Sequence, residues 1–100
     1  MNTKTKRVLR LTLKKRWFDM IARGEKREEY RVPSNWIMSR LRGKRYDVVQ
    51  FKNGYGATAP MVEVEFLGWE IGYGRLSWGA GFDKVVVIYL GRVLKQGVQA

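Results

Sequence analysis

The chain has 100 residues, of which 45% are hydrophobic and 13% aromatic, and this is enough apolar material for one packed domain. It contains no cysteine and no histidine, which excludes disulfides, thiolate or histidine metal sites and histidine-based catalytic triads. The net charge is +11, and 15 of the 20 Lys and Arg residues precede position 46, together with only 4 of the 9 Asp and Glu residues. A basic half on a small domain indicates a polyanionic partner, usually nucleic acid.

The first elements are a strand and a helix. Residues 1–7 are basic and almost free of apolar side chains, so we expect a flexible basic arm there. Val8–Leu13 alternates between apolar and other residues, which predicts a half-buried strand. Residues 14–23 change to a helical period, and Gly24 is expected to end that helix in a left-handed conformation.

The next eight residues are densely charged: Gly24-Glu25-Lys26-Arg27-Glu28-Glu29-Tyr30-Arg31. On an extended backbone Glu29 and Arg31 share one face, whereas Lys26 points to the other. All three meet only if the strand begins after Lys26, which a glycine turn allows. Such a cluster is suited to gripping an anion or moving a proton. The alternative is an exposed ion pair worth about 0–1 kcal/mol.

Further elements follow in order. Residues 29–32 are predicted to form the second strand, and a short helix is expected over residues 36–41, capped by Ser34 or Asn35. Residues 46–51 form the third predicted strand, and a glycine-rich turn follows at residues 53–56.

The last third of the chain predicts two more strands, at residues 61–66 (with a continuation over 67–71 left open) and 83–90, separated by a glycine-rich loop without regular structure. Glu63 and Glu65 share one face of the earlier strand. They could be metal ligands with Glu29 or Asp47, but we favour a solvated sheet face.

These elements predict an α+β fold. We expect a small curled sheet or β-barrel of five or six mostly antiparallel strands with two short helices, because closure hides sheet edges. The domain spans residues 8–94, and residues 95–100 are expected to be a tail. No apolar run is long enough to cross a membrane, and no signal-peptide stretch is present at the N-terminus, so a cytoplasmic protein is expected.

The octapeptide also carries a family resemblance. Gly24, Lys26, Glu29 and Arg31 fit the pattern G-x-K-x-x-E-x-R, and the chain from residue 8 to residue 94 resembles the ASCH domain family. The resemblance implies a PUA-like β-barrel with a cleft that binds RNA or a nucleotide. It implies that Lys26 is a cleft cation or proton carrier, Glu29 the cleft carboxylate and Arg31 a phosphate or carboxylate clamp.

Other residues complete the predicted interface. The segment Phe51-Lys52-Asn53-Gly54-Tyr55 resembles a loop of the same family. Trp36, Tyr55, Tyr73 and Trp78 lie in or beside turns, where aromatic side chains either stack on bases or close the ends of a barrel. The expected nucleic-acid-binding residues are Lys26, Arg27, Arg31, Lys52, Asn53, Tyr55 and Trp78.

An enzymatic alternative stays open. Some relatives implied by the resemblance are amidohydrolases that remove the acetyl group from acetylated cytidine, and one is described as a ribonuclease. Lys26 and Glu29 would then be the catalytic residues. The amidohydrolases use a threonine where this chain has Glu29, and a carboxylate cannot replace a hydroxyl nucleophile without a change of chemistry. No cofactor is expected, and a divalent metal is left open.

Overall fold

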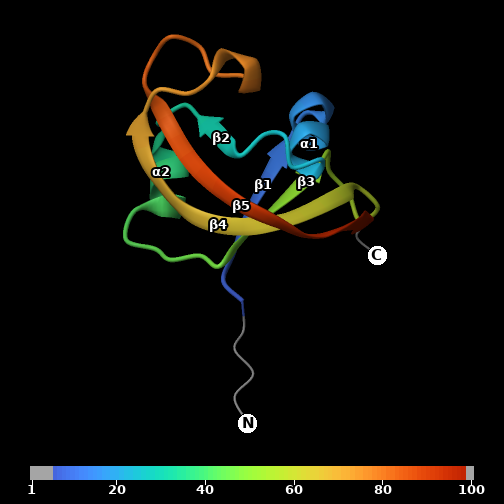
Figure 1. The fold of residues 1–100 in the computed structure, drawn as a ribbon. Coiled ribbons are helices and arrows are strands. Elements are labelled where there is room, and N and C mark those ends of the chain that lie inside the picture. Colours follow the sequence, from blue (N-terminus) through green and yellow to red (C-terminus); the bar gives the residue numbers. More distant parts are fainter. Residues whose placement is uncertain (1–5, 99–100) are drawn as a thin grey trace.

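The computed structural model describes residues 6–98 (Figure 1). Its elements, in chain order, are β1 (Val8–Leu13), α1 (Lys15–Ala22), β2 (Glu28–Arg31), α2 (Asn35–Leu41), β3 (Val48–Asn53), β4 (Pro60–Gly72), the 3₁₀ turn η1 (Leu76–Trp78) and β5 (Val85–Val98). Within the described residues the fold is therefore a small α+β domain with five strands and two α-helices, as the alternating patterns predict.

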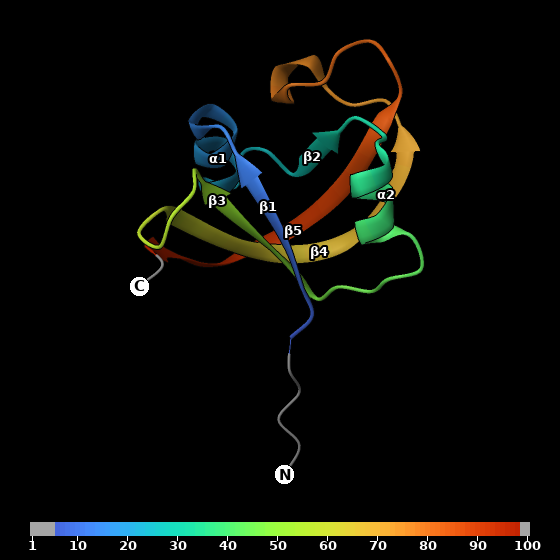
Figure 2. The ribbon, with the colours of Figure 1, turned by 180° about the vertical axis from the view of Figure 1, so that it is seen from behind.

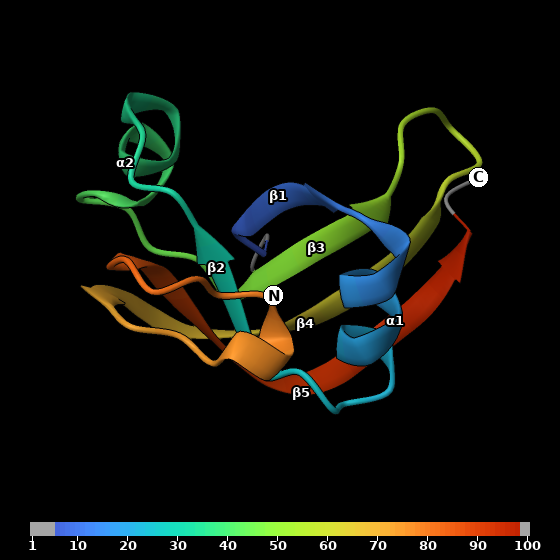
Figure 3. The same cartoon turned by 90° about the horizontal axis from the view of Figure 1, so that it is seen from above.

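The strands form one mixed sheet in the order β1-β3-β4-β5-β2. β1 pairs with β3 in parallel, and the other pairs are antiparallel. β4 and β5 are long and pair through several register shifts between Glu63 and Gly68, and bulges of this kind increase the local bend of a sheet. The sheet curls into a half-barrel, so its edge strands β1 and β2 approach each other on the open side, with α1 and α2 at its two ends (Figure 3).

The core fills the concave side of this sheet. The inward residues of β1 are Leu9, Leu11 and Leu13, all buried, and they alternate with more exposed neighbours as a strand of period two requires. Both helices contribute buried side chains to the same cluster, Phe18 and Ile21 from α1 and Ile37 and Leu41 from α2. The helices thus cover an apolar face that the half-barrel alone would leave in water.

The two short helices have identifiable ends. Gly24 follows α1 with φ of +78°, and the N–H groups of Gly24 and Glu25 donate to the carbonyls of Ile21 and Met20. Ser34 caps α2, where its hydroxyl accepts a hydrogen bond from the N–H of Ile37 at 3.2 Å. Both ends agree with the signals in the sequence.

Four expectations about the chain after residue 45 need correction. The final strand does not end at residue 90, because β5 continues to Val98 and pairs with the start of β4, so residues 95–98 are strand and not tail. The side-chain amide of Gln96 also donates to the carbonyl of Ala22. The loop before β5 contains the turn η1, and β3 begins and ends two residues later than predicted.

Glu63 is the fourth correction, since it is not solvated. Only 6% of it is exposed, because β4 is an interior strand and Glu63 lies between Gln50 of β3 and Lys95 of β5. Lys6 pairs with it at 3.0 Å. Arg7 donates its backbone N–H to Asp47, so these two residues of the expected basic arm contact the sheet, while residues 1–5 lie outside the described residues.

None of the helices within residues 6–98 combines the length and the apolar character that a membrane-spanning helix needs.

Candidate functional site

The glycine turn after α1 positions Lys26. The N–H groups of Glu25 and Lys26 both donate to the carbonyl of Met20, which folds the chain back under the helix before β2 starts at Glu28. Lys26 therefore precedes the regular strand and is free of its alternation. This is the condition that allows Lys26 to share a face with Glu29 and Arg31.

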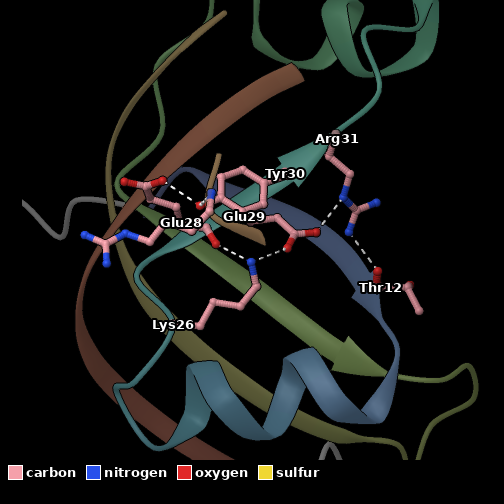
Figure 4. Close-up of polar contacts among 7 residues, drawn as sticks. Thr12, Lys26, Glu28, Glu29, Tyr30 and Arg31 are labelled. Atoms are coloured by element: carbon pink, nitrogen blue, oxygen red, sulfur yellow. Dashed lines mark hydrogen bonds and ion pairs between the residues drawn. The ribbon is translucent and has the colours of Figure 1, made fainter. Parts of the chain in front are cut away.

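The three motif side chains converge, with Glu29 between the two cations (Figure 4). Lys26 Nζ lies 3.4 Å from Glu29 Oε1, and Arg31 Nε lies 2.7 Å from Glu29 Oε2. Arg31 Nη2 also donates to the backbone carbonyl of Thr12 at 2.8 Å. Because Thr12 belongs to β1 and Arg31 to β2, this guanidinium bridges the two edge strands on the open side of the half-barrel.

Lys26 is enclosed by the protein, with 2% of the residue exposed. Its ammonium donates to the carbonyl of Glu28 and lies 4.5 Å from the ring centre of Tyr30 and 5.7 Å from that of Trp17. Burial lowers the pKa of Lys26 below its ordinary value of 10.5, and the attraction of Glu29 opposes this shift. Lys26 is thus held by a carboxylate, a carbonyl and aromatic faces.

Tyr30 lies on the opposite face of β2 from Glu29 and links the site to the loop before β5. Its hydroxyl donates to Glu28 Oε1 at 2.7 Å and accepts the N–H of Arg75 at 2.9 Å. Burial is the main cause that raises the pKa of the Tyr30 phenol to about 12. The loop is seated closely here, because Gly74 packs against the Tyr30 ring and Gly79 against the Trp17 ring.

A pocket of about 640 Å³ opens on the Arg31 side of this cluster; we call it the motif pocket. It lies where the ends of β1 and β3 meet the start of α2. Its lining residues are Arg10, Leu11, Thr12, Leu13, Lys14, Arg31, Trp36, Asn53, Gly54 and Tyr55. The pocket therefore combines three cations with two aromatic side chains, and no lining residue is acidic.

The predicted residues divide into three groups. Arg31, Asn53 and Tyr55 line the motif pocket, and Tyr55 is 89% exposed there. Lys26 and Glu29 lie behind Arg31 and are buried.

The remaining predicted residues lie outside the pocket lining. Arg27 is exposed and its carbonyl accepts the N–H of Leu90, Lys52 donates to the carbonyl of Gly56, and Trp78 packs under the guanidinium of Arg75.

Among the charged and aromatic residues of the pocket lining, three are absent from the binding set that the sequence predicts: Arg10, Lys14 and Trp36. The alternation of Val8–Leu13 already placed Arg10 and Thr12 on the outward face of β1. What the pattern could not show is that α2 carries Trp36 to this face, because that placement depends on helix packing.

The acidic side chains of the described residues offer no metal site. Within residues 6–98, no group of three or more Asp or Glu side chains is arranged to hold a metal ion. Glu65 is bonded to Arg92 and Glu63 to Lys6, so both carboxylates already have cationic partners.

Comparison of the chain with models of known families, with curated proteins and with solved structures gives no match.

Proposed function

We propose that this chain is a PUA-like domain of the ASCH family that binds RNA or a nucleotide in the motif pocket. The octapeptide resemblance and the half-barrel with flanking helices support the family and the fold. The excess of positive charge in the first half of the chain supports a polyanionic ligand.

The lining of the motif pocket carries this proposal. Arg10, Lys14 and Arg31 supply positive charge for phosphate, while Trp36 and Tyr55 offer aromatic faces for bases. Arg31 uses two of its donor nitrogens for Glu29 and Thr12, and a guanidinium has further N–H groups for a phosphate oxygen. Glu29 holds the guanidinium in one orientation, with Lys26 behind it.

The test is a titration with the 5′-phosphorylated dinucleotide pUpU, followed by tryptophan fluorescence. Lys14→Ala and Tyr55→Ala remove exposed pocket residues that the fold does not need. We expect Lys14→Ala to weaken binding about fivefold and Tyr55→Ala about tenfold or more, since stacking on one base is worth about 1–3 kcal/mol.

Lys84→Ala and Tyr73→Ala are matched controls, because both side chains are exposed and lie outside the pocket lining. They should bind pUpU as the parent protein does. If pUpU does not bind, or if the pocket variants bind it as well as the controls do, the proposal is wrong.

A hydrolase is the second candidate, and one observation favours it. Lys26 is a buried amine with a lowered pKa, 3.4 Å from the carboxylate of Glu29, and such pairs serve as proton carriers in enzymes. Incubation with acetylated cytidine and with labelled RNA, with and without Mg²⁺ or Mn²⁺, tests it. Turnover that disappears in Lys26→Met would support it, and the absence of turnover under all conditions would eliminate it.

A further inference from the structure

The motif pocket is the first of three neighbouring hollows, two of which are lined by β1 while the third lies beside Arg7, directly before β1. A second hollow of about 250 Å³ lies between β1 and α2 and shares Arg10 and Trp36 with the motif pocket. A third, of about 470 Å³, lies beside Arg45 and shares Tyr46 with the second. We call the three together the β1 track; β1 and α2 lie on the same side of the molecule in Figure 2.

The β1 track is basic throughout. Its exposed cations are Lys14, Arg10, Arg40, Lys44, Arg45 and Arg7. Within the described residues, Arg7 is the only one of these six that forms an ion pair, with Asp47 at 3.8 Å, and no Asp or Glu lines any of the three hollows. A line of exposed cations along hollows that no acidic side chain lines attracts a chain of phosphates.

Aromatic side chains occur in each hollow. The motif pocket has Tyr55, Trp36 lies at its junction with the second hollow, and Tyr46 and Trp69 line the third. Arg40 lies 5.0 Å from the Trp36 ring centre, so a cation and a stacking surface are already paired at the middle of the track. Alternating cations and aromatic faces are the features that bind single-stranded nucleic acid without a fixed sequence.

The length of the track suits several nucleotides. A strand rises about 3.3 Å per residue, which puts Arg7 and Lys14 about 23 Å apart along β1. We propose, on the basis of the function proposed above, that the ligand is an extended single strand of RNA that starts in the motif pocket and follows β1 to Arg45. The track then holds about four nucleotides, at the lower end of the range that small single-strand-binding barrels cover.

The experiment compares two ligands and two double variants of the full chain. The ligands are pUpU, which fits the motif pocket, and the uridine octanucleotide U8, which can follow the whole track. Arg40→Ala/Arg45→Ala removes two track cations outside the motif pocket, and Lys84→Ala/Lys95→Ala removes two exposed cations elsewhere, so both variants have the same net charge.

We expect U8 to bind the parent protein at least about tenfold more strongly than pUpU. Arg40→Ala/Arg45→Ala should weaken the binding of U8 about tenfold. The slope of log K against log salt should become less negative by about 1.4, because each phosphate contact on a single strand contributes about 0.7 to that slope. The binding of pUpU by this variant should stay within about twofold of the parent value, because a twofold change is smaller than the loss of one contact would cause. The control variant should bind both ligands normally.

Equal losses of U8 binding in the two double variants would overturn the proposal that RNA follows the β1 track, because net charge alone would then explain the effect. So would U8 binding no stronger than pUpU binding, or equal binding of an eight-base-pair duplex, whose bases cannot stack on the protein. In each of these cases normal binding of pUpU leaves the proposed function intact, whereas the failure of pUpU to bind contradicts the proposed function itself.

Discussion

Glu29 is the residue on which the site depends, because it is the common partner of two cations. It is 5% exposed and bonds to Lys26 through one oxygen and to Arg31 through the other. A buried charge is tolerated in a fold when its partners and hydrogen bonds replace water. Lys26 and Glu29 therefore form the buried part of the site. Glu29 holds the guanidinium of Arg31 in place where it lines the pocket.

Glu29→Gln is expected to destabilise the fold by about 3–5 kcal/mol, because it leaves Lys26 buried without a counter-charge. The free energy of unfolding, measured by chemical denaturation, checks this. The matched control is Glu25→Gln, which breaks an exposed pair with Arg23 and should change stability by about 0–1 kcal/mol. A loss below about 1 kcal/mol for Glu29→Gln would show that Lys26 does not need its partner.

Ionisation of Tyr30 is expected to lower the stability of the fold at high pH. Burial raises the pKa of its phenol to about 12, so the folded protein holds this proton more strongly than the unfolded chain, whose tyrosine pKa is about 10. The stabilising contribution is complete below pH about 10 and is lost as the pH rises through about 12. The hydrogen bond to Glu70 also raises the pKa of Tyr89 to about 12, so ultraviolet titration of tyrosinate should show one late-titrating group fewer in Tyr30→Phe than in the parent protein. If Tyr30→Phe removes a group that titrates near pH 10, burial is not what controls this phenol.

At the scale of elements, the site depends on two edge strands that form no backbone ladder with each other. β1 and β2 lie at opposite ends of the strand order, and the Arg31 guanidinium joins them through the carbonyl of Thr12. The loop from residue 73 to residue 84 covers the other side of Lys26, where it contacts Tyr30 and Trp17. The motif is thus positioned by β1, β2 and this loop, and the loop is distant from both strands in sequence.

Gly74→Ala tests the seating of that loop. A Cβ at position 74 would lie 2.5 Å from Cζ of Tyr30 and 2.8 Å from Cβ of Ala80, so the loop or the ring has to move. We expect a loss of about 1–3 kcal/mol in the free energy of unfolding. Gly81→Ala is the control, since an added Cβ there meets no atom within 4 Å, and it should change stability by less than about 0.5 kcal/mol. Equal effects of both substitutions would contradict the close packing of Gly74 on Tyr30.

For the whole molecule, the uneven distribution of charge is the feature that relates fold to ligand. The positive excess lies before position 46, and the half-barrel brings six exposed cations of that part, together with the half-buried Arg31, to the β1 track. Cations that follow one strand and its neighbouring helix produce a stronger local field than the same number spread over the surface.

Binding of U8 is therefore expected to weaken steeply with salt. If each of the about four nucleotides on the track has its phosphate neutralised, log K should fall with log salt at a slope of about −3, since single strands give about −0.7 per neutralised phosphate. Titrations between about 50 and 200 mM salt measure the slope. A slope near zero would mean that phosphates do not provide the affinity.

Particular residues show how far the sequence could lead. The glycine that ends α1, the serine that caps α2 and the alternation of β1 are local signals, and all three are confirmed because local hydrogen bonding and period decide them. The predictions for Glu63 and for residues 95–98 were wrong, since a polar segment becomes strand or becomes buried only when a partner strand lies beside it. The sequence predicted that Lys26, Glu29 and Arg31 meet only if the strand begins after Lys26, and β2 does begin at Glu28.

The sequence by itself determined most of the elements and their order along the chain, together with the charged octapeptide, because these depend on neighbours along the chain. Only the tertiary structure decided that Lys26 is enclosed while Arg31 faces a pocket, and that Arg10, Lys14 and Trp36 complete it. The physical reason is that burial and shared surfaces arise from the curling of the sheet and the docking of α2, and contacts between distant segments leave no periodic mark in the sequence.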